Sequence, residues 1–309
     1  MQSRAEAFSR SADARRRDVL TMVRRAWLEV YYAQQAWSVV NESRPFFDDL
    51  VTITRSMYGV GRKTQHDVLR AELELSRLDD RLIEASRARA EAQAALSRWL
   101  SQDAYRPIAQ KLPDWESVPM LEDLRDSLLS HPSLAATQAS IDAKETAVDI
   151  AEENKKPEWA LDLAYGYRDG FQPNGTPRSD FVSLSVTVGL PFFRENRQDR
   201  KLAAALSEHR AARYSQHELS ARLKSELDAE YARWTDLTRR LALYETQILE
   251  QSKGQAQAAL LAYQSDTGDF SDVMRGYIDD LNTRLEHIRL QVERAQSYAV
   301  LANLGGLER

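Results

Sequence analysis

The feature that most constrains this chain is an internal repeat. A motif that begins at Tyr58 recurs about 205 residues later at Tyr263. The first copy reads Tyr-Gly-Val-Gly-Arg-Lys-Thr-Gln-His-Asp-Val-Leu over residues 58–69, and the second reads Tyr-Gln-Ser-Asp-Thr-Gly-Asp-Phe-Ser-Asp-Val-Met over residues 263–274. The tyrosine, the last aspartate and the apolar pair after it keep the same register. Self-similarity at a fixed distance predicts that the chain contains two copies of one structural unit.

Upstream of the motif the two copies also match, with the offset reduced by one residue. Five apolar positions of the first copy fall opposite five of the second, namely Val23, Trp27, Val30, Ala33 and Trp37 against Leu227, Tyr231, Trp234, Leu237 and Leu241. Successive positions lie three or four residues apart, which is the spacing of one face of an α-helix. Each unit is therefore expected to carry a long helix before its motif.

After the first motif, small and apolar residues follow a heptad pattern. One position of the heptad holds Val68, Leu75, Leu82 and Leu96, with Arg89 interrupting the series, and the other holds Ala71, Leu78, Ala85, Ala92 and Trp99. This pattern is typical of a coiled-coil seam, in which alanine lets two helices approach closely. Gly59 and Gly61 can adopt the positive φ that a tight reversal needs. We therefore predict two long antiparallel helical hairpins that turn near residues 58–64 and 263–270.

Between the two helical copies the apolar period falls to two. A loop at residues 112–119 leads to a helix that opens at His131-Pro132 and closes at Lys155-Lys156-Pro157. Apolar residues then alternate with small or polar ones along two runs, Trp159, Leu161, Leu163, Tyr165 and Tyr167 in the first, and Val182, Leu184, Val186, Val188 and Leu190 in the second. This alternation predicts one β-hairpin at about residues 159–190. Its length and aromatic ends suit an outer-membrane barrel, and a hairpin that covers a soluble core fits the pattern equally well.

The composition agrees with long, solvated helices. The 309 residues include 11 Gly and 9 Pro, 29% are charged, and the formal net charge is −5 with both signs interspersed. An interspersed surface does not advertise nucleic-acid binding, and the absence of cysteine excludes disulfides and thiol chemistry. No apolar run approaches the roughly 18 residues of a membrane-spanning helix. The charged and hydroxyl-rich start Met1-Gln-Ser-Arg-Ala-Glu does not resemble a secretory signal.

Together these features resemble the TolC-like outer membrane efflux proteins. The resemblance rests on the tip motif Tyr58-x-Val60-Gly61-x-x-Thr64-x-x-Asp67-Val68-Leu69, its second occurrence, the helix from His131-Pro132 to Pro157, and a β-hairpin that closes with Leu190-Pro191-Phe192. It covers essentially the whole chain. The tip motif alone is weakly specific, whereas two tips with the strand pair and the Leu-Pro-Phe exit between them are a strong signature.

The resemblance implies a mainly α fold in a homotrimer, with a periplasmic helical tunnel and one outer-membrane barrel closed by strands from three chains. Such a trimer is the passive exit duct of a tripartite efflux system, without enzymatic activity or a cofactor. Its partners are a periplasmic adaptor (membrane fusion) protein and an inner-membrane transporter. On this resemblance the chain divides into a first tunnel hairpin (1–101), an equatorial loop and helix (102–157), a barrel β-hairpin (158–191) and a second tunnel hairpin (192–309).

The same resemblance suggests roles for the residues at the tips. The residues it implies to face the adaptor are Tyr58, Val60, Gly61 and Thr64 in the first tip, and Tyr263, Thr267 and Gly268 in the second. Asp272 matches an acidic residue that narrows the periplasmic entrance in the family, and a cap for the tip helix is the alternative role. Two positions depart from the family pattern. Arg275 stands where a second acid is expected, so it becomes a candidate partner for Asp272, and Asp266 replaces the turn glycine.

A third departure concerns the start of the chain. Complete family members carry a β-hairpin before each long helical pair, whereas Met1 here aligns with about Ala205, just past the second β-hairpin. A trimer would then supply six strands, fewer than the eight of the smallest closed barrels. The expectation is that an N-terminal signal, helix and β-hairpin are missing, and that this chain alone does not conduct.

Enzymatic sites lack a supporting constellation. The histidines at 66, 131, 209, 217 and 287 show no metal-binding spacing, and the carboxylates follow helical surface spacing beside arginine. The rival hypothesis is a cytosolic or periplasmic coiled-coil scaffold or adaptor without channel activity. The absent signal and the mean hydropathy of −0.55 favour it, and the alternating strand pair argues against it.

Overall fold

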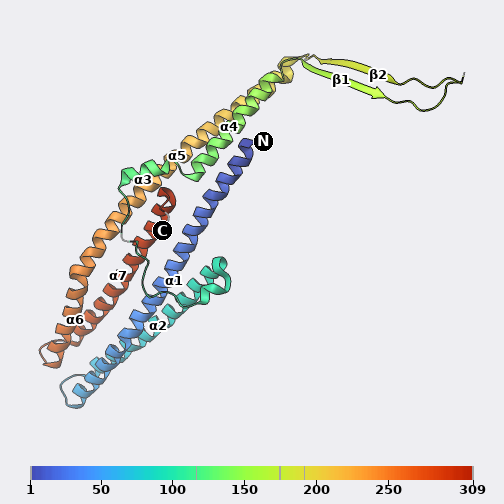
Figure 1. Ribbon diagram of the computed structural model, residues 1–309. Coiled ribbons are helices and arrows are strands. Elements are labelled where there is room, and N and C mark those ends of the chain that lie inside the picture. Colours follow the sequence, from blue (N-terminus) through green and yellow to red (C-terminus); the bar gives the residue numbers. More distant parts are fainter. Residues whose placement is uncertain (1, 116, 174, 191, 308–309) are drawn as a thin grey trace. The chain divides into compact units, whose positions relative to one another are not determined.

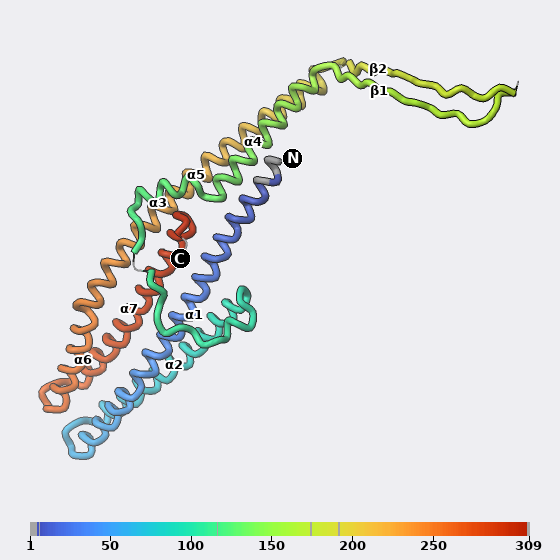
Figure 2. The backbone as a smooth tube through the Cα atoms, viewed as in Figure 1, coloured from blue at the N-terminus to red at the C-terminus, as the bar shows by residue number. Residues whose placement is uncertain are grey.

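The computed structural model describes residues 2–115, 117–173, 175–190 and 192–307, and most of them are helical (Figure 1). The elements in chain order are α1 (Gln2–Gly59), α2 (Gln65–Leu100), the 3₁₀ helix η1 (Ser101–Tyr105), α3 (Leu121–Leu128), α4 (Pro132–Glu153), β1 (Glu158–Gly166), β2 (Phe181–Gly189), the 3₁₀ helix η2 (Arg194–Asn196), α5 (Gln198–Leu243), the π-helical turn η3 (Tyr244–Ile248), α6 (Leu249–Gln264) and α7 (Phe270–Gly305). The predicted mainly α fold with a single β-hairpin is confirmed. The tube in Figure 2 follows α1 into α2 and α6 into α7 through two short turns.

The chain forms two compact units. Met1–Asp13 and Pro132–Arg222 make up the first, and Ala14–His131 and Leu223–Arg309 make up the second. Helices α1 and α5 each contribute residues to both units. This grouping follows contacts in space, so it joins segments that are far apart in the sequence.

In the first unit, α4 and α5 run antiparallel and lead into the β-hairpin. Lys144 pairs with Glu208 at 2.6 Å, and Lys155 pairs with Asp199 at 2.7 Å. Strands β1 and β2 pair antiparallel from Glu158 opposite Gly189 to Gly166 opposite Phe181. This register places the apolar side chains of both strands on one face, as the alternation predicts.

The apolar face of the hairpin is not covered within the described part of the chain. The large apolar side chains on β1 and β2 are all exposed, among them Trp159, Leu161, Leu163, Val186 and Leu184. The possibility that the hairpin covers a soluble core is therefore wrong for this chain. The Leu-Pro-Phe exit can be followed only in part, because Pro191 lies outside the described residues.

The second unit is built on two helical hairpins that share one apolar core. Buried residues come from α1, α2, α6 and α7, including Phe47, Leu78, Tyr263, Val273 and Leu281. In the first hairpin the predicted seam is buried at Ala71, Leu78 and Leu96. Ion pairs such as Arg44 with Asp79, at 2.8 Å, lie beside it.

Arg89 interrupts the heptads without breaking the seam. Its guanidinium lies 5.1 Å from the centre of the Trp37 ring. A planar cation can stack on an aromatic face while its polar edge stays hydrated. The arginine thus fills a seam position by stacking, which the heptad pattern alone does not reveal.

The one-residue change of offset between the two copies coincides with the π-helical turn η3 in the second copy. The offset is 204 residues at Trp37 and Leu241, and 205 at the tyrosines of the tips, so the second copy has one extra residue between these points. The π-helical turn η3 lies in this interval. In a π turn the hydrogen bonds span one more residue than in an α-helix, which is how a single inserted residue is accommodated within a helix. The first copy has Pro45 near the corresponding level of α1.

The segment between the hairpins holds more structure than the sequence predicts. Helix α3 lies between the predicted loop and the predicted helix, in a stretch to which the sequence assigned no element, and its Leu124 and Leu128 are buried. The preceding loop is anchored by aromatic contacts, since Trp115 stacks on Tyr298 with 5.3 Å between ring centres. Helix α4 begins at Pro132 and ends before Pro157, as predicted.

Candidate functional site

The first tip reverses the chain with a glycine in the left-handed region. Gly61 has φ +74°, and the Gly61 amide donates to the Tyr58 carbonyl at 2.9 Å. The Arg62 amide donates to the Met57 carbonyl at 2.9 Å, which satisfies a carbonyl at the end of α1. Gly59 was also expected to have positive φ, but it is the last residue of α1 and is helical. One left-handed residue is enough for this reversal.

Helix α2 starts with a reciprocal capping box. The Thr64 hydroxyl accepts from the Asp67 amide at 3.3 Å, and the Asp67 carboxylate accepts from the Thr64 amide at 3.0 Å. This arrangement satisfies two amides that the first turn of a helix leaves without partners. Thr64 therefore has a structural role at the tip, independent of any docking role.

The second tip makes the same reversal without a glycine at the left-handed position. Asp266 takes φ +63° at the position equivalent to Gly61. The Thr267 and Gly268 amides both donate to the Ala262 carbonyl, at 2.9 and 3.0 Å. A Cβ atom at Gly268 would lie 2.9 Å from the Ala262 Cβ atom, so this glycine is needed for close approach rather than for its φ.

The start of α7 differs from the start of α2. Asp269 is the N-cap residue, but its side chain makes no capping hydrogen bond. Asp272 occupies the position of Asp67, and its amide donates to the Asp269 carbonyl at 3.1 Å. The second tip thus lacks the reciprocal box of the first.

Lysine and arginine side chains connect the two tips. The Lys63 ammonium lies 3.0 Å from an Asp266 carboxylate oxygen and 4.6 Å from the centre of the Tyr263 ring. The hydrogen bond to Asp266 raises the pKa of Lys63, so the lysine stays charged. Arg70 donates to the Ser271 hydroxyl at 2.7 Å. Neither cation was singled out from the sequence, because the pattern does not place the two tips side by side.

The two tyrosines of the repeated motif have opposite surroundings. Tyr58 is 47% exposed, and the neighbouring Val60 is 72% exposed. Tyr263 is fully buried, its ring packs edge-on against Phe270 at 5.9 Å, and its hydroxyl donates to the Thr54 hydroxyl at 3.4 Å. Burial raises the pKa of Tyr263. Within this chain Tyr263 cannot present its ring to a partner, so any influence on docking acts through the shape of the tip.

Asp272 and Arg275 are both exposed on α7. Within the described ranges neither side chain makes an ion pair or a hydrogen bond, with each other or with another residue. Three positions apart on a helix, they lie on neighbouring parts of one surface. A single copy of the chain therefore leaves both charges available to other molecules.

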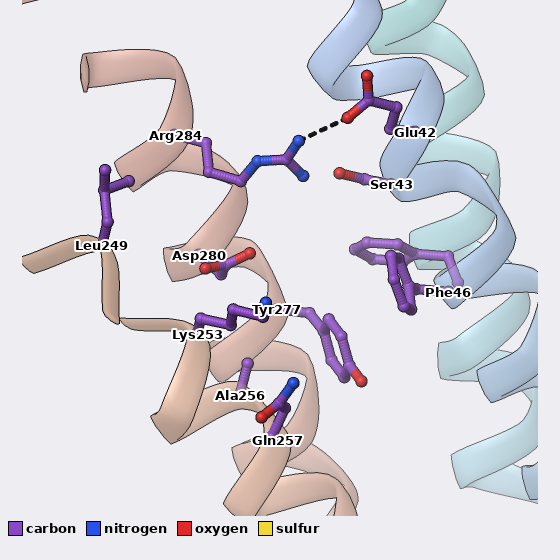
Figure 3. Close-up of a pocket in the computed structure, with 11 residues that line it drawn as sticks. Glu42, Ser43, Phe46, Leu249, Lys253, Ala256, Gln257, Tyr277, Asp280 and Arg284 are labelled. Atoms are coloured by element: carbon purple, nitrogen blue, oxygen red, sulfur yellow. Dashed lines mark hydrogen bonds and ion pairs between the residues drawn. The ribbon is translucent and has the colours of Figure 1, made fainter. Parts of the chain in front are cut away.

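A pocket of about 530 Å³ lies between α1, α6 and α7 in the second unit. The rings of Phe46 from α1 and Tyr277 from α7 stack with their centres 5.9 Å apart. Figure 3 shows both among the residues that line the pocket. Arg284 pairs with Glu42 at 2.7 Å on one side, and Asp280 lies between Arg284 and Lys253. Burial raises the pKa of the Asp280 carboxyl, while the two cations act in the opposite direction.

The described residues contain no group of three or more His, Asp or Glu side chains placed to hold a metal ion. Over the same ranges, no helix combines the length and the apolarity needed to cross a membrane. The motifs at the two tips combine turn geometry, exposed apolar surface and, at Asp272 and Arg275, charged side chains without an ion pair to a described residue.

Comparison with known proteins assigns the architecture. No family model matches the chain. It is 26% identical to protein CyaE of Bordetella pertussis, and the match covers 94% of this chain and 63% of CyaE, so the chain spans less than two thirds of that relative. Among solved structures it is similar to CusC (TM-score 0.87, 14% identity, 98% of this chain and 72% of that one), the outer-membrane channel OprN (0.86, 17%, 99% and 70%) and the outer membrane protein VceC of Vibrio cholerae (0.85, 19%, 98% and 74%).

These likenesses define the class at the level of the fold. Over the part of these outer-membrane channel proteins that it covers, the chain has their fold, with a β-hairpin inserted between two helical hairpins in the sequence. This is the TolC-like fold, and the resemblance drawn from the tip motifs is confirmed as a resemblance of fold.

Proposed function

We propose that this chain forms part of the outer-membrane exit duct of a tripartite efflux system. The observation that carries the proposal is the β-hairpin, whose apolar face remains exposed on a chain with the TolC-like fold. A scaffold or adaptor protein has no need of such a face, because exposed strands with one continuous apolar surface invite aggregation in water. In a bilayer the same face is stable.

We divide the proposed duct subunit as the resemblance suggests. Residues 1–101 and 192–309 are the two hairpins of a periplasmic tunnel, 102–157 is the equatorial region and 158–191 is the outer-membrane hairpin. The assembly that the resemblance implies is a homotrimer, in which strands from the other chains satisfy the backbone groups at the hairpin edges.

The tips are the proposed docking surface for the periplasmic adaptor, which in turn binds the inner-membrane transporter. Tyr58 and Val60 supply exposed apolar contacts, and Gly61, Thr64, Thr267 and Gly268 shape the loops around them. Tyr263 supports the second loop from inside. Asp272 and Arg275 lie on α7 just beyond this surface, at the proposed entrance, where three copies of Asp272 would repel one another unless Arg275 pairs with them.

Two experiments test the proposal. Cells that express the full-length protein are fractionated, and the protein should appear in the outer membrane. Recovery in the cytosol would contradict the proposal and favour a coiled-coil scaffold. A photo-crosslinking amino acid at position 60 should then capture a periplasmic protein from the envelope, whereas the same probe at the exposed position Tyr214, remote from the tips in the sequence, should not.

Trimer contacts at the entrance can be tested separately. Single-channel recording on the full-length Arg275→Ala protein should show a higher open probability than wild type, because an exposed charge pair contributes up to about 1 kcal/mol per subunit. Asp272→Ala should mainly weaken cation preference. Open probability and selectivity identical to wild type in both variants would remove the entrance role of these residues.

A further inference from the structure

The segment that joins the β-hairpin to α5 carries exposed aromatic residues in a strained conformation. Phe192 and Phe193 are 69% and 84% exposed. Phe193 has φ 58° and ψ 48°, the left-handed region, which is unfavourable for a bulky side chain with a Cβ atom. No ring contact with another described residue offsets the backbone strain at Phe193.

A group of cations follows these aromatic residues directly. Arg194, Arg197, Arg200 and Lys201 are exposed, and none of them makes an ion pair with a described residue. Asp199, an acid within the same stretch, is already paired with Lys155 at 2.7 Å. Glu195 is then the one acid of the segment without an ion pair to a described residue, and the four cations stand against two acids, a net charge of +2 over 192–201 on a chain whose net charge is −5.

The position of these cations is unfavourable for the helix itself. Arg200 and Lys201 lie in the first turn of α5, and Arg197 directly precedes it, so the three cations gather at the start of this helix. Positive side chains in the first turn of a helix are repelled by the positive end of the helix dipole. Such a placement costs stability unless an anionic surface lies opposite.

The register of the β-hairpin identifies which end of it this segment adjoins. Glu158 pairs with Gly189, so Trp159 lies at the same end as Phe192 and Phe193. Trp159 is exposed on the apolar face. Exposed Trp and Phe side chains at the end of an apolar strand pair, followed by Lys and Arg, are the arrangement found at a membrane–water interface.

We infer that Trp159, Phe192 and Phe193, together with Arg194, Arg197, Arg200 and Lys201, form a lipid-binding collar for the anionic phospholipids of the bilayer leaflet next to the helices. The aromatic rings enter the interfacial region and the four cations contact lipid phosphates. This inference rests on the proposed function, because it requires the β-hairpin to lie in a bilayer. It adds that the protein distinguishes anionic from neutral lipid on the helical side.

The test is binding of the full chain to vesicles of phosphatidylcholine alone and of phosphatidylcholine mixed with phosphatidylglycerol. The collar variant replaces all four cations by Gln. A matched control removes three arginines and one lysine from exposed sites farther along α5: Arg210→Gln, Arg213→Gln, Arg222→Gln and Lys224→Gln. Each cation near an anionic surface is expected to change the partition coefficient about fivefold.

The collar variant should therefore bind anionic vesicles at least about a hundredfold more weakly than wild type, while its binding to neutral vesicles is unchanged. The control should stay within a few fold of wild type on both. Added salt should weaken wild-type binding to anionic vesicles more than that of the collar variant.

A second variant reports on the aromatic part without removing charge. Phe193→Gly relieves the backbone conformation, so it should raise the melting temperature of the chain in water and weaken binding to neutral and anionic vesicles alike. Phe8→Gly is not a suitable comparison, because Phe8 lies within α1. Phe171→Gly, an exposed aromatic at the opposite end of the hairpin, gives the control for a lost ring.

The vesicle experiments distinguish a failure of the lipid-binding collar from a failure of the proposed outer-membrane function. Equal binding of wild type to both kinds of vesicle, with no effect of the collar variant, would overturn the collar and leave the proposed membrane hairpin standing. Displacement of wild type from vesicles by inorganic phosphate would also overturn it, because the cations would then recognise a free anion. Failure of wild type to bind any vesicle would overturn both proposals together.

Discussion

The two tips make the same reversal by different means. The first relies on signals that are local in the sequence, Gly61 at the left-handed position and the Thr64 and Asp67 box at the start of α2. The second places Asp266 where glycine is expected, has no side-chain cap, and is held instead by the burial of Tyr263 and by Lys63 from the other tip. A turn can therefore be specified by its own residues or by what packs against it, and duplicated copies of one motif have come to use one route each.

The largest difference in stability between the two tips is expected when the two equivalent tyrosines are replaced. Tyr263→Ala should lower the free energy of unfolding by about 3 to 5 kcal/mol, because it leaves a cavity in the shared core and removes the contact with Phe270. Tyr58→Ala should change it by less than about 0.5 kcal/mol, since half of the side chain is already in water. Urea denaturation of both variants measures the difference, and similar losses would show that the tips are held alike.

Substitutions at the two left-handed positions, Gly61 and Asp266, should give a smaller difference in stability between the tips. Gly61→Ala should cost about 1 to 2 kcal/mol, since a side chain is placed in a conformation that only glycine adopts freely. Asp266→Gly should be close to neutral, because the relaxed backbone offsets the loss of the Lys63 pair, an exposed interaction worth at most about 1 kcal/mol. Asp266→Asn keeps the turn preference and isolates the charge. A large loss in Asp266→Gly would mean that Lys63 stabilises the second tip far more than a surface pair can.

Replacing the N-cap residues of α2 and α7 should give a still smaller difference in stability between the tips. Thr64→Ala should cost about 1 kcal/mol, the usual value for removing a side-chain N-cap. Asp269→Ala should cost only a few tenths, from the loss of a carboxylate near the helix start, because no hydrogen bond is broken. Thermal unfolding of the pair checks this order, which a larger effect in Asp269→Ala would reverse.

The smallest expected effect on stability concerns a position that is apolar in the first copy and acidic in the second. Leu75 lies in the seam of the first hairpin, and Asp280 stands at the equivalent place in the second, facing the pocket. Burial raises the pKa of Asp280 in the folded state. Its ionised form is then less stable in the fold, so its contribution to stability is full below the pKa of the unfolded carboxyl and is lost as pH rises through the raised value.

Asp280→Asn should therefore be slightly more stable than wild type at about pH 7, by less than about 1 kcal/mol, and equal to it at about pH 3. Unfolding curves across this range measure the convergence. Asp279→Asn, which replaces the carboxylate at the neighbouring exposed position, is the matched control. A stability advantage of Asp280→Asn that grows on acidification would contradict the stated cause.

The sequence predicted those parts of the fold that depend on periodicity. The helices and the β-hairpin follow from spacings of three, four and two residues, which reflect burial on one face, and the two reversals follow from the repeated motif with its glycines. Gly59 was misjudged because one left-handed residue suffices where two glycines are available. Helix α3 was missed because eight residues are too few for a periodic signal.

The candidate site was predicted less completely, for a physical reason. Tyr58, Val60 and Thr64 could be placed at the first tip from the motif alone. The role of Lys63 depends on the second tip lying beside the first, and the burial of Tyr263 depends on core residues from four helices. Equal positions in a repeat have equal backbone geometry, but their exposure is decided by neighbours that the repeat does not encode.

The π-helical turn η3 has a consequence for the phase of the second hairpin. Each residue added to an α-helix rotates everything beyond it by about 100°. An extra residue between Leu241 and Tyr263 would therefore have turned Tyr263 out of the core and carried the whole second tip to another side of α6. The wider turn absorbs that rotation within five residues, so the helix on either side keeps the same face toward α7. The second copy gained a residue and kept its orientation.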